Sequence, residues 1–322
     1  MYGKEFIKLL HKGKIMENVI AIYIYHDASI CIKIGNNYRI FEVERFTRQR
    51  YDTLINSDYE KIYSTVFDII RKDYNIENFD VCLYIHDLVP EQKKYLIKLW
   101  KIKEFRNCDH HLAHAMGAFY LSGFNESLII SYDGGGPNKE NFIEYFEVYY
   151  ANKSKGELLY CSSIPLDLGA PYGVTAIPIS EIHKTQNYEE KFLSFAGKLM
   201  GLSAYGKDQT DNLIPLKIFF KEKIGDPILL YEKFKKLKIG VNPLNLNINT
   251  LEAGLSYNLA RASQQIFEEI FIEYTHGILS KNENIPLCLT GGCALNVLLN
   301  ERIRLMYPKI PIFIPPNPND CG

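Results

Sequence analysis

The stretch Asp109-His110-His111-Leu112-Ala113-His114-Ala115 places His110 and His114 four residues apart. On an α-helix these positions lie one turn apart on the same face, with Cβ atoms about 5–6 Å apart. Both imidazole rings would then reach a single metal ion. Asp109 is a candidate N-cap, apolar residues follow at helical spacing, and Gly123 is a candidate helix end. The stretch therefore predicts a metal-binding helix. The alternative is that the histidines lie at the start of a helix and bind no metal.

Two aspartates are candidates for the remaining ligands. Asp133 follows an apolar run that predicts a strand, and it precedes three glycines. A strand that delivers a carboxylate and then turns through glycine supplies a third ligand, while its backbone N–H groups face an anion. Asp320 lies in a loop after the short strand predicted at 312–314, and it is the candidate fourth ligand; the alternative is an ordinary loop aspartate. The three glycines are Gly134, Gly135 and Gly136.

Two further glycine-containing segments are candidate anion contacts. Gly291 and Gly292 form a turn between a predicted strand at 286–290 and the segment with Asn296, where backbone amides at a helix N-terminus approach a nucleotide closely. Any tight strand-to-helix connection uses such a turn, which is the alternative. The segment 196–207 carries Lys198 and Lys207, whose charges suit a phosphate or carbamoyl oxygen. Its alternative is a solvated turn.

The order of predicted elements repeats along the chain. Strands at 18–25, 29–34 and 38–43 precede a helix at 56–73 and a strand at 81–85, and a second set begins at 126 with strands near 126–133, 144–150 and 158–162. A long helix is expected at 256–281. The repeat predicts an α/β fold with an extension at 1–18, a first lobe at 19–125 that includes the metal-binding helix, and a second, nucleotide-binding lobe at 126–322.

Composition narrows the class of protein. The chain has 322 residues, a net charge of −1 and a pI near 6.7, which gives no electrostatic attraction to nucleic acid or to an anionic membrane. The seven cysteines form no C-x-x-C pair, and a reducing cytoplasm is the expected compartment. No apolar stretch reaches the roughly 18 residues of a membrane span. We therefore expect a cytoplasmic protein without a nucleic-acid or membrane partner.

Taken in order, the motifs resemble those of the NodU/CmcH O-carbamoyltransferase family. The likeness runs in patches from about residue 19 to the last residue, and its pattern differs from the family's at Tyr25, Val43 and Ala204. The motifs are His-Asp-Ala-Ser from His26, Glu-Val-Glu-Arg-Phe-Thr-Arg from Glu42, His-His-Leu-Ala-His-Ala from His110, Tyr-Asp-Gly-Gly-Gly from Tyr132, Gly-Lys-Leu-Met-Gly-Leu-Ser-Ala-Tyr-Gly-Lys from Gly197, Thr-Gly-Gly-Cys-Ala-Leu-Asn from Thr290, and Asn-Asp-Cys-Gly from Asn319.

The resemblance implies two RNase H-like lobes of the actin-like ATPase (ASKHA) superfamily. Its metal ligands fall on His110, His114, Asp133 and Asp320, a set that suits Fe, Zn or Mn as the divalent ion. Members of the family continue into a C-terminal YrdC-like domain, where carbamoyl phosphate and ATP are thought to form carbamoyladenylate. This sequence ends two residues after Asp320. We therefore expect an incomplete second lobe and no YrdC-like domain, which would have to act in trans.

The activity implied by the resemblance is transfer of a carbamoyl group from carbamoyladenylate to a hydroxyl of a small-molecule or sugar acceptor. His26 is expected to take the hydroxyl proton, and Lys198 or Lys207 to stabilise the carbamoyl oxygen. His111, about 100° from the ligand face, is expected to contact the ligands or the substrate. Two alternatives stay open: threonylcarbamoyl transfer to tRNA, and a non-catalytic nucleotide- or metal-binding remnant.

Overall fold

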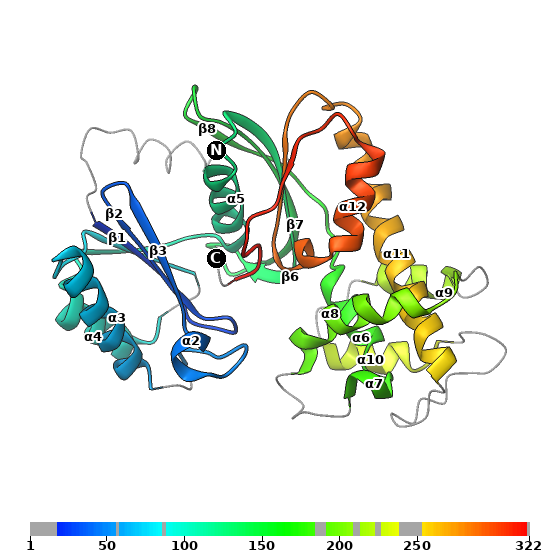
Figure 1. Ribbon diagram of the computed structural model, residues 1–322, viewed down its shortest axis with the longest axis horizontal. Coiled ribbons are helices and arrows are strands. Elements are labelled where there is room, and N and C mark those ends of the chain that lie inside the picture. Colours follow the sequence, from blue (N-terminus) through cyan, green and yellow to red (C-terminus); the bar gives the residue numbers. More distant parts are fainter. Residues whose placement is uncertain are drawn as a thin grey trace.

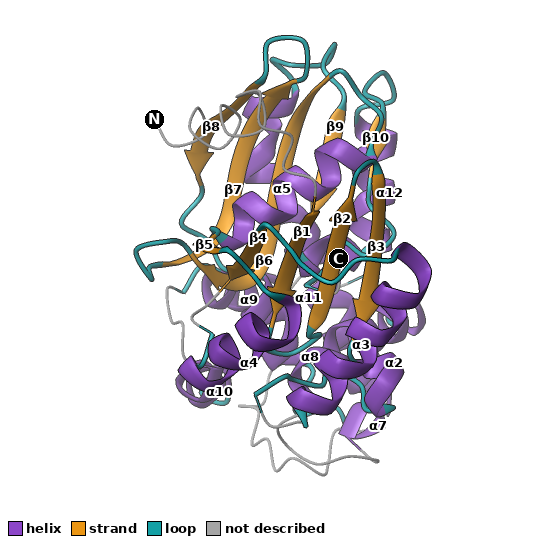
Figure 2. Ribbon diagram, turned by 90° about the vertical axis from the view of Figure 1, so that its left-hand side faces the viewer, coloured by secondary structure: helices purple, strands orange, loops and turns teal. Residues whose placement is uncertain are grey.

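The computed structural model describes residues 18–55, 58–85, 88–183, 191–208, 213–222, 227–237 and 253–320. These residues form two α/β lobes, each built on one five-stranded sheet (Figures 1 and 2). The predicted N-terminal extension, apart from Asn18, lies outside the described residues. The prediction of two α/β lobes is confirmed, and the first strand ends at Tyr23, two residues earlier than expected.

The first sheet has the strand order β3-β2-β1-β4-β5. Strand β1 pairs antiparallel with β2 and parallel with β4, so the hairpin lies on one side of the central strand. Helices α3 and α4 pack on the face that carries Ile20, Ile30 and Cys82. The elements are β1 (Asn18–Tyr23), β2 (Ser29–Ile34), β3 (Asn37–Glu42), α2 (Glu44–Thr47), α3 (Tyr59–Tyr74), β4 (Val81–Ile85), α4 (Pro90–Trp100) and β5 (Glu104–Asn107).

The second sheet repeats this order strand for strand. Read from β8, its order is β8-β7-β6-β9-β10, with β6 antiparallel to β7 and parallel to β9. The two lobes are therefore an internal structural repeat, and the expected incompleteness of the second lobe stays a prediction. The strands are β6 (Glu126–Pro137), β7 (Ile143–Asn152), β8 (Glu157–Ser163), β9 (Leu287–Thr290) and β10 (Ile312–Phe313).

The long helix α11 packs on one face of the second sheet, where Phe271 stacks on Phe146 at a ring distance of 5.4 Å. The glycine-punctuated segment ends in a turn against α11, and a Cβ on Gly206 would lie 2.1 Å from the carbonyl oxygen of Tyr257. That glycine therefore permits close helix packing. The helices are α6 (Gly169–Thr175), α7 (Ser180–His183), α8 (Lys191–Leu202), η1 (Ser203–Tyr205), α9 (Leu213–Phe220), α10 (Pro227–Phe234), α11 (Ala253–Leu279), η2 (Gly292–Leu295) and α12 (Val297–Met306).

Helix α5 (His110–Leu121) follows β5 in the chain but packs on the second sheet. Its residues Leu112, Ala115 and Phe119 are buried against apolar side chains of β6, β7 and β9. The sequence predicted that this helix belongs to the first lobe, but its apolar residues pack on the sheet of the second lobe. Figure 1 shows it between the two sheets.

The two ends of α5 differ in how well they were predicted. The Asp109 side chain does not cap the helix, although Asp109 occupies the N-cap position. Its Oδ1 instead accepts a hydrogen bond of 2.6 Å from the backbone N–H of Lys139, so that capping prediction is wrong. The predicted end at Gly123 is confirmed within one residue, because Ser122 is the C-cap and Gly123 follows with φ +74°.

Among the described residues, no helix combines the length and the apolar character that a bilayer span requires. The six cysteines within the described ranges are free thiols. The cytoplasmic location stays a prediction.

Stability should fall as pH rises because of Glu147 on β7, which is fully buried. Burial raises the pKa of this carboxyl to about 7, against about 4.3 in an unfolded chain. Between these two pKa values the folded protein keeps the proton and the unfolded chain loses it. The free energy of unfolding therefore falls as pH rises through this window. Glu147→Gln, which keeps an acceptor for the Ser163 hydroxyl, should be more stable than the wild type by about 1–3 kcal/mol at pH 8 and not at pH 4. Urea unfolding at both pH values measures this, and parallel pH profiles of the two proteins would contradict it.

Candidate metal centre

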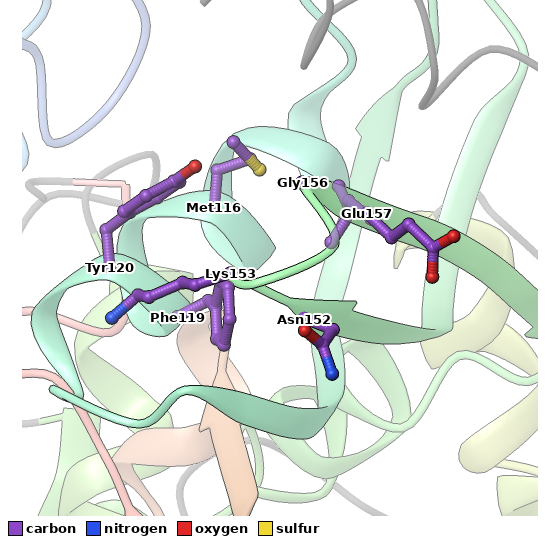
Figure 3. Close-up of a pocket in the computed structure, with 8 residues that line it drawn as sticks. Met116, Phe119, Tyr120, Asn152, Lys153, Gly156 and Glu157 are labelled. Carbon is purple, nitrogen blue, oxygen red and sulfur yellow. The ribbon is translucent and has the colours of Figure 1, made fainter. Parts of the chain in front are cut away.

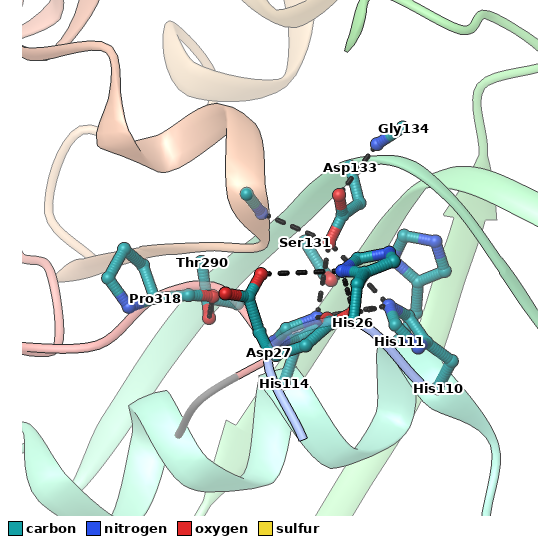
Figure 4. A network of polar contacts seen from close by, with 12 residues as sticks. His26, Asp27, His110, His111, His114, Ser131, Asp133, Gly134, Thr290 and Pro318 are labelled. Carbon is teal, nitrogen blue, oxygen red and sulfur yellow. Dashed lines mark hydrogen bonds and ion pairs between the residues drawn. The ribbon is translucent and has the colours of Figure 1, made fainter. Parts of the chain in front are cut away.

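Four side chains from three separate parts of the chain converge at one point. His110 and His114 come from the first two turns of α5, and Asp133 comes from β6 (Figure 4). Asp320 comes from the loop after β10. The two Nε2 atoms are 3.1 Å apart. His114 Nε2 lies 3.2 Å from Asp133 Oδ2 and 3.1 Å from Asp320 Oδ1, and His110 Nε2 lies 3.5 and 3.4 Å from the same atoms.

These distances fit a small divalent cation. Four ligands at about 2.0–2.1 Å from a tetrahedral ion lie about 3.3–3.4 Å from one another. The distance between the two imidazole nitrogens and the four distances from them to the carboxylate oxygens run from 3.1 to 3.5 Å, and all four donor atoms lie within 4.8 Å of one another. The His110 ring is buried, and its Nδ1 has no hydrogen-bond partner among the described residues. Its Nε2 is therefore the atom through which this buried ring finds polar partners. Two imidazoles and two carboxylates are a donor set that suits Zn(II), Fe(II) or Mn(II).

The four groups also stabilise one another electrostatically. Burial alone would lower the pKa of His114, but hydrogen bonds with Asp133 and Asp320 raise it to about 9. Burial would likewise raise the pKa of Asp133, yet the two histidines hold it well below its usual range. The pKa of Asp320 is lowered as well, because the histidines outweigh its burial. The centre therefore carries negative carboxylates that attract positive charge, whether as protons or as a metal ion.

The two glycine turns orient the Asp133 carboxylate. The backbone N–H of Gly134 donates to Oδ1 at 2.6 Å, and that of Gly292 donates to Oδ2 at 3.0 Å. Gly291 has φ +89°, and a Cβ there would lie 2.3 Å from the carbonyl oxygen of Tyr132. Its own N–H donates to the carbonyl of Pro318. These three amides, which we expected to face an anion, are therefore used within the protein.

The other two glycines of the Gly134–Gly136 motif leave no space for a side chain. A Cβ on Gly136 would lie 2.1 Å from Cγ of His110, so the imidazole packs directly on the backbone of β6. Gly135 has φ +126°, a conformation that other residues rarely adopt. Gly135 and Gly136 are thus required by the local backbone and by the packing of His110, whereas a Cβ on Gly134 would have no atom within 4 Å. Nucleotide binding by these glycines stays a prediction.

His26 lies at the exposed edge of the centre, and its catalytic role stays a prediction. Its Nδ1 is 3.3 Å from Asp27 Oδ2 and 3.8 Å from Asp320 Oδ2, and 43% of its side chain is exposed. The Asp320 loop is joined to the first lobe, because Ser29 Oγ donates to the Asp320 carbonyl at 3.2 Å. Both lobes therefore contribute to the centre.

The other predicted site residues lie on different elements. Lys198 is exposed on α8, and Lys207 is exposed after η1, where its N–H donates to Asn258. Asn296 caps α12, and its side chain exchanges hydrogen bonds with Gln264 in a buried network. A cofactor role for Asn296 and catalytic roles for the lysines stay predictions.

His111 has a role that the sequence only partly indicated. It is fully buried, with Nδ1 2.7 Å from Ser131 Oγ and Nε2 2.9 Å from the carbonyl of Glu144. Burial and the neighbouring His110 lower its pKa to about 4, so the ring stays neutral. Its two hydrogen bonds join α5 to β6 and β7, and they fix the part of the helix that carries His110 and His114. Tyr23, which the sequence analysis missed, packs against His110 at a ring distance of 6.2 Å; its only signal was its place at a strand end.

The sequence of the chain is similar to those of known proteins. The profile of the family described as "Carbamoyltransferase N-terminus" matches residues 82–322. The chain belongs to this family. A nodulation protein NolNO of Sinorhizobium fredii is 23% identical over 355 residues, covering 96% of this chain and 47% of the relative. The uncharacterized protein MJ1051 of Methanocaldococcus jannaschii is 27% identical over 238 residues, covering 70% of this chain and 42% of the relative.

The fold of this chain is also similar to those of solved structures. A crystal structure of full-length HypF in the phosphate- and nucleotide-bound form aligns with a TM-score of 0.54 at 12% identity, over 97% of this chain and 54% of that one. T. kodakarensis HypF aligns with a TM-score of 0.50 at 15% identity, over 95% and 46%. The chain spans about half the length of the relatives it matches.

Replacing either histidine ligand should abolish tight metal binding. His110→Ala and His114→Ala each remove one of the four donors, and we expect metal affinity to fall by more than about 100-fold, beyond the loss typical of outer-shell changes. His111→Ala should lower stability instead, because it leaves Ser131 and the Glu144 carbonyl without their partner. Zinc titration monitored by calorimetry, with thermal unfolding alongside, separates the effects. Equal loss of affinity in all three variants would contradict the assignment.

A pair of glycine variants tests the packing around His110. Gly136→Ala should displace the imidazole and weaken metal binding at least about ten-fold, because the new methyl group overlaps the ring. Gly134→Ala is the matched control, since a Cβ there has no atom within 4 Å. The measurement is the same zinc titration. Similar affinities for the two variants would show that His110 is not held as described.

Proposed function

We propose that this member of the carbamoyltransferase family transfers a carbamoyl group from carbamoyladenylate to a hydroxyl of a small-molecule or sugar acceptor. The observation that carries the proposal is the convergence of His110, His114, Asp133 and Asp320 beside the half-exposed His26. The family match and the fold shared with HypF support carbamoyl transfer as the reaction class. A divalent cation bound there would supply Lewis-acid polarisation of the carbamoyl group.

The chain's own residues supply the proton transfer and the orientation. Asp27 engages Nδ1 of His26, which leaves Nε2 as the atom that accepts the acceptor's hydroxyl proton. The hydroxyl oxygen then forms a bond to the carbamoyl carbon, and the bond to AMP breaks. Asp133 cannot rotate away, because two backbone N–H groups hold its carboxylate.

The nucleotide is proposed to lie along the glycine turns of the second lobe. A Cβ on Gly134 would have no atom within 4 Å, so a ligand can approach the backbone there. Lys198 and Lys207 are proposed to contact its phosphate or the carbamoyl oxygen from the helical side of that lobe. Carbamoyladenylate would come from a YrdC-like domain acting on carbamoyl phosphate and ATP.

Turnover tests this proposal directly. The chain, a divalent metal, a YrdC-like protein, ATP and carbamoyl phosphate labelled at carbon are incubated with a panel of sugars and hydroxylated antibiotics. We expect label in an acceptor, and a rate about 10²–10⁴-fold lower for His26→Ala at unchanged metal content. Lys139→Ala, on the surface near Asp109, is the control and should be fully active. Label in no acceptor from a metal-loaded chain would favour the non-catalytic alternative. A parallel mixture with threonine, labelled bicarbonate, ATP and tRNA tests the threonylcarbamoyl alternative, which label in tRNA would favour.

A further inference from the structure

A cavity of about 470 Å³ lies between the first sheet and α5, and it reaches the metal centre. His110, His114 and Asp320 line one end of it, whereas Asp133 and the glycines of the two turns do not. A molecule in this cavity therefore reaches the centre without passing the glycines proposed to face the nucleotide. A smaller pocket of about 120 Å³ lies between α5 and the hairpin of β7 and β8, and it contains none of the metal ligands (Figure 3).

The polar side chains of the larger cavity lie around the Asp320 loop, and several of them already have partners within the protein. Ser29 Oγ donates to the Asp320 carbonyl at 3.2 Å, and Thr290 Oγ1 donates to the Pro318 carbonyl at 3.3 Å. The side-chain amide of Asn317 donates to a carboxylate at the end of β3 at 2.9 Å. These groups therefore offer few hydrogen bonds to the hydroxyls of a bound molecule.

Away from the metal centre the wall is apolar. It includes Ala21 and Leu83 from the first sheet, and Met116 and Leu121 from α5. The Cys31 thiol also lines this part, and burial raises its pKa to about 11, so the thiol stays neutral. A hydroxyl that leaves water for such a surface loses its hydrogen bonds. The wall therefore favours an apolar molecule over one with many hydroxyls.

The volume and the polar end of the cavity fit a small organic ligand. Ligand pockets of about 300–1,000 Å³ are typically apolar, with a few polar groups that fix the orientation of the ligand. His26 lies beside the polar end, because its Nδ1 is 3.8 Å from Asp320 Oδ2. Its ring also packs against Tyr23, which lines the cavity, at a ring distance of 6.2 Å. A hydroxyl at this end is therefore next to both the metal donors and the proposed base.

We propose that this cavity binds the acceptor, and that the acceptor is an alcohol with an apolar ring system rather than a free sugar. Its hydroxyl lies at the end lined by His110, His114 and Asp320. Its rings pack between Ala21 of the first sheet and Gly117 of α5. This assignment rests on the proposed carbamoyl transfer, for which it selects one of the two acceptor classes.

Binding of a simple apolar alcohol tests the cavity without turnover. The probe is 1-naphthaleneethanol, and calorimetry measures its dissociation constant for the zinc-loaded chain. Gly117→Leu should raise this constant at least about ten-fold, because Gly117 lines the cavity and has room for a side chain that would fill it. Gly277→Leu, at an exposed position of α11, is the matched control and should leave the constant unchanged. Methyl glucoside should bind at least about ten-fold more weakly than the probe.

The visible spectrum of the cobalt-loaded chain tests where the hydroxyl lies. We expect 1-naphthaleneethanol to shift the cobalt bands, because its oxygen reaches the ion. The matched compound 1-ethylnaphthalene lacks the hydroxyl and should leave the bands unchanged. A zinc titration of Gly117→Leu shows whether its metal centre is intact. If it is not, Ala21→Leu narrows the cavity from the sheet side and replaces the first variant.

Turnover with the same compounds separates this assignment from the proposed function. We expect carbamoyl label in 1-naphthaleneethanol, and less label with Gly117→Leu. Label in sugars alone, at a rate that Gly117→Leu does not change, would overturn the assignment while the proposed function stands. Label in no acceptor would overturn the proposed function and the acceptor role together, although probe binding would still identify a site for apolar alcohols.

Two binding results would overturn the assignment whatever the turnover. The first is a dissociation constant for 1-naphthaleneethanol that neither Gly117→Leu nor Ala21→Leu changes, because the probe then binds elsewhere. The second is binding that weakens as the concentration of the chain rises, because a second copy then covers the cavity.

Discussion

The attraction between two imidazoles and two carboxylates, whose nitrogen and oxygen atoms are 3.1–3.5 Å apart, is the constraint on which the rest of this structure depends. Bringing two buried acidic groups together costs free energy unless positive charge compensates them. The histidines supply part of that compensation by binding protons, and a divalent cation would supply it more completely. The surrounding fold therefore has to deliver four donors from α5, β6 and the loop after β10 to one point.

The backbone around the centre follows from that requirement. Gly136 is a glycine because His110 packs where its Cβ would be, and the amide of Gly292 is placed to hold Asp133. His111 fixes the start of α5 to β6 and β7 through two hydrogen bonds, so the helix cannot turn its ligands away from the carboxylate. The Asp320 loop is tied to β9 and to β2, which makes the centre a junction of both lobes.

Much of this arrangement could be predicted from local sequence. The four-residue spacing of His110 and His114 predicts their common direction on a helix, and the repeated strand-and-hairpin starts predict two lobes. Long-range packing could not be read this way. That α5 would cover the second sheet depends on the match between its apolar side and Ile129, Tyr149 and Cys288, residues far away in the chain. The sequence predicted that the amides of the glycine turns face an anion. Three of these amides donate to acceptors within the protein, and the spacing of the glycines does not reveal this.

The X-ray absorption spectrum of the zinc-loaded chain tests the central claim most directly. The account predicts a first shell of nitrogen and oxygen at about 2.0–2.2 Å, with the outer-shell scattering of two imidazoles and no sulfur. A spectrum with sulfur ligands, or one without imidazole scattering, would show that the ion binds elsewhere and would contradict the proposed centre.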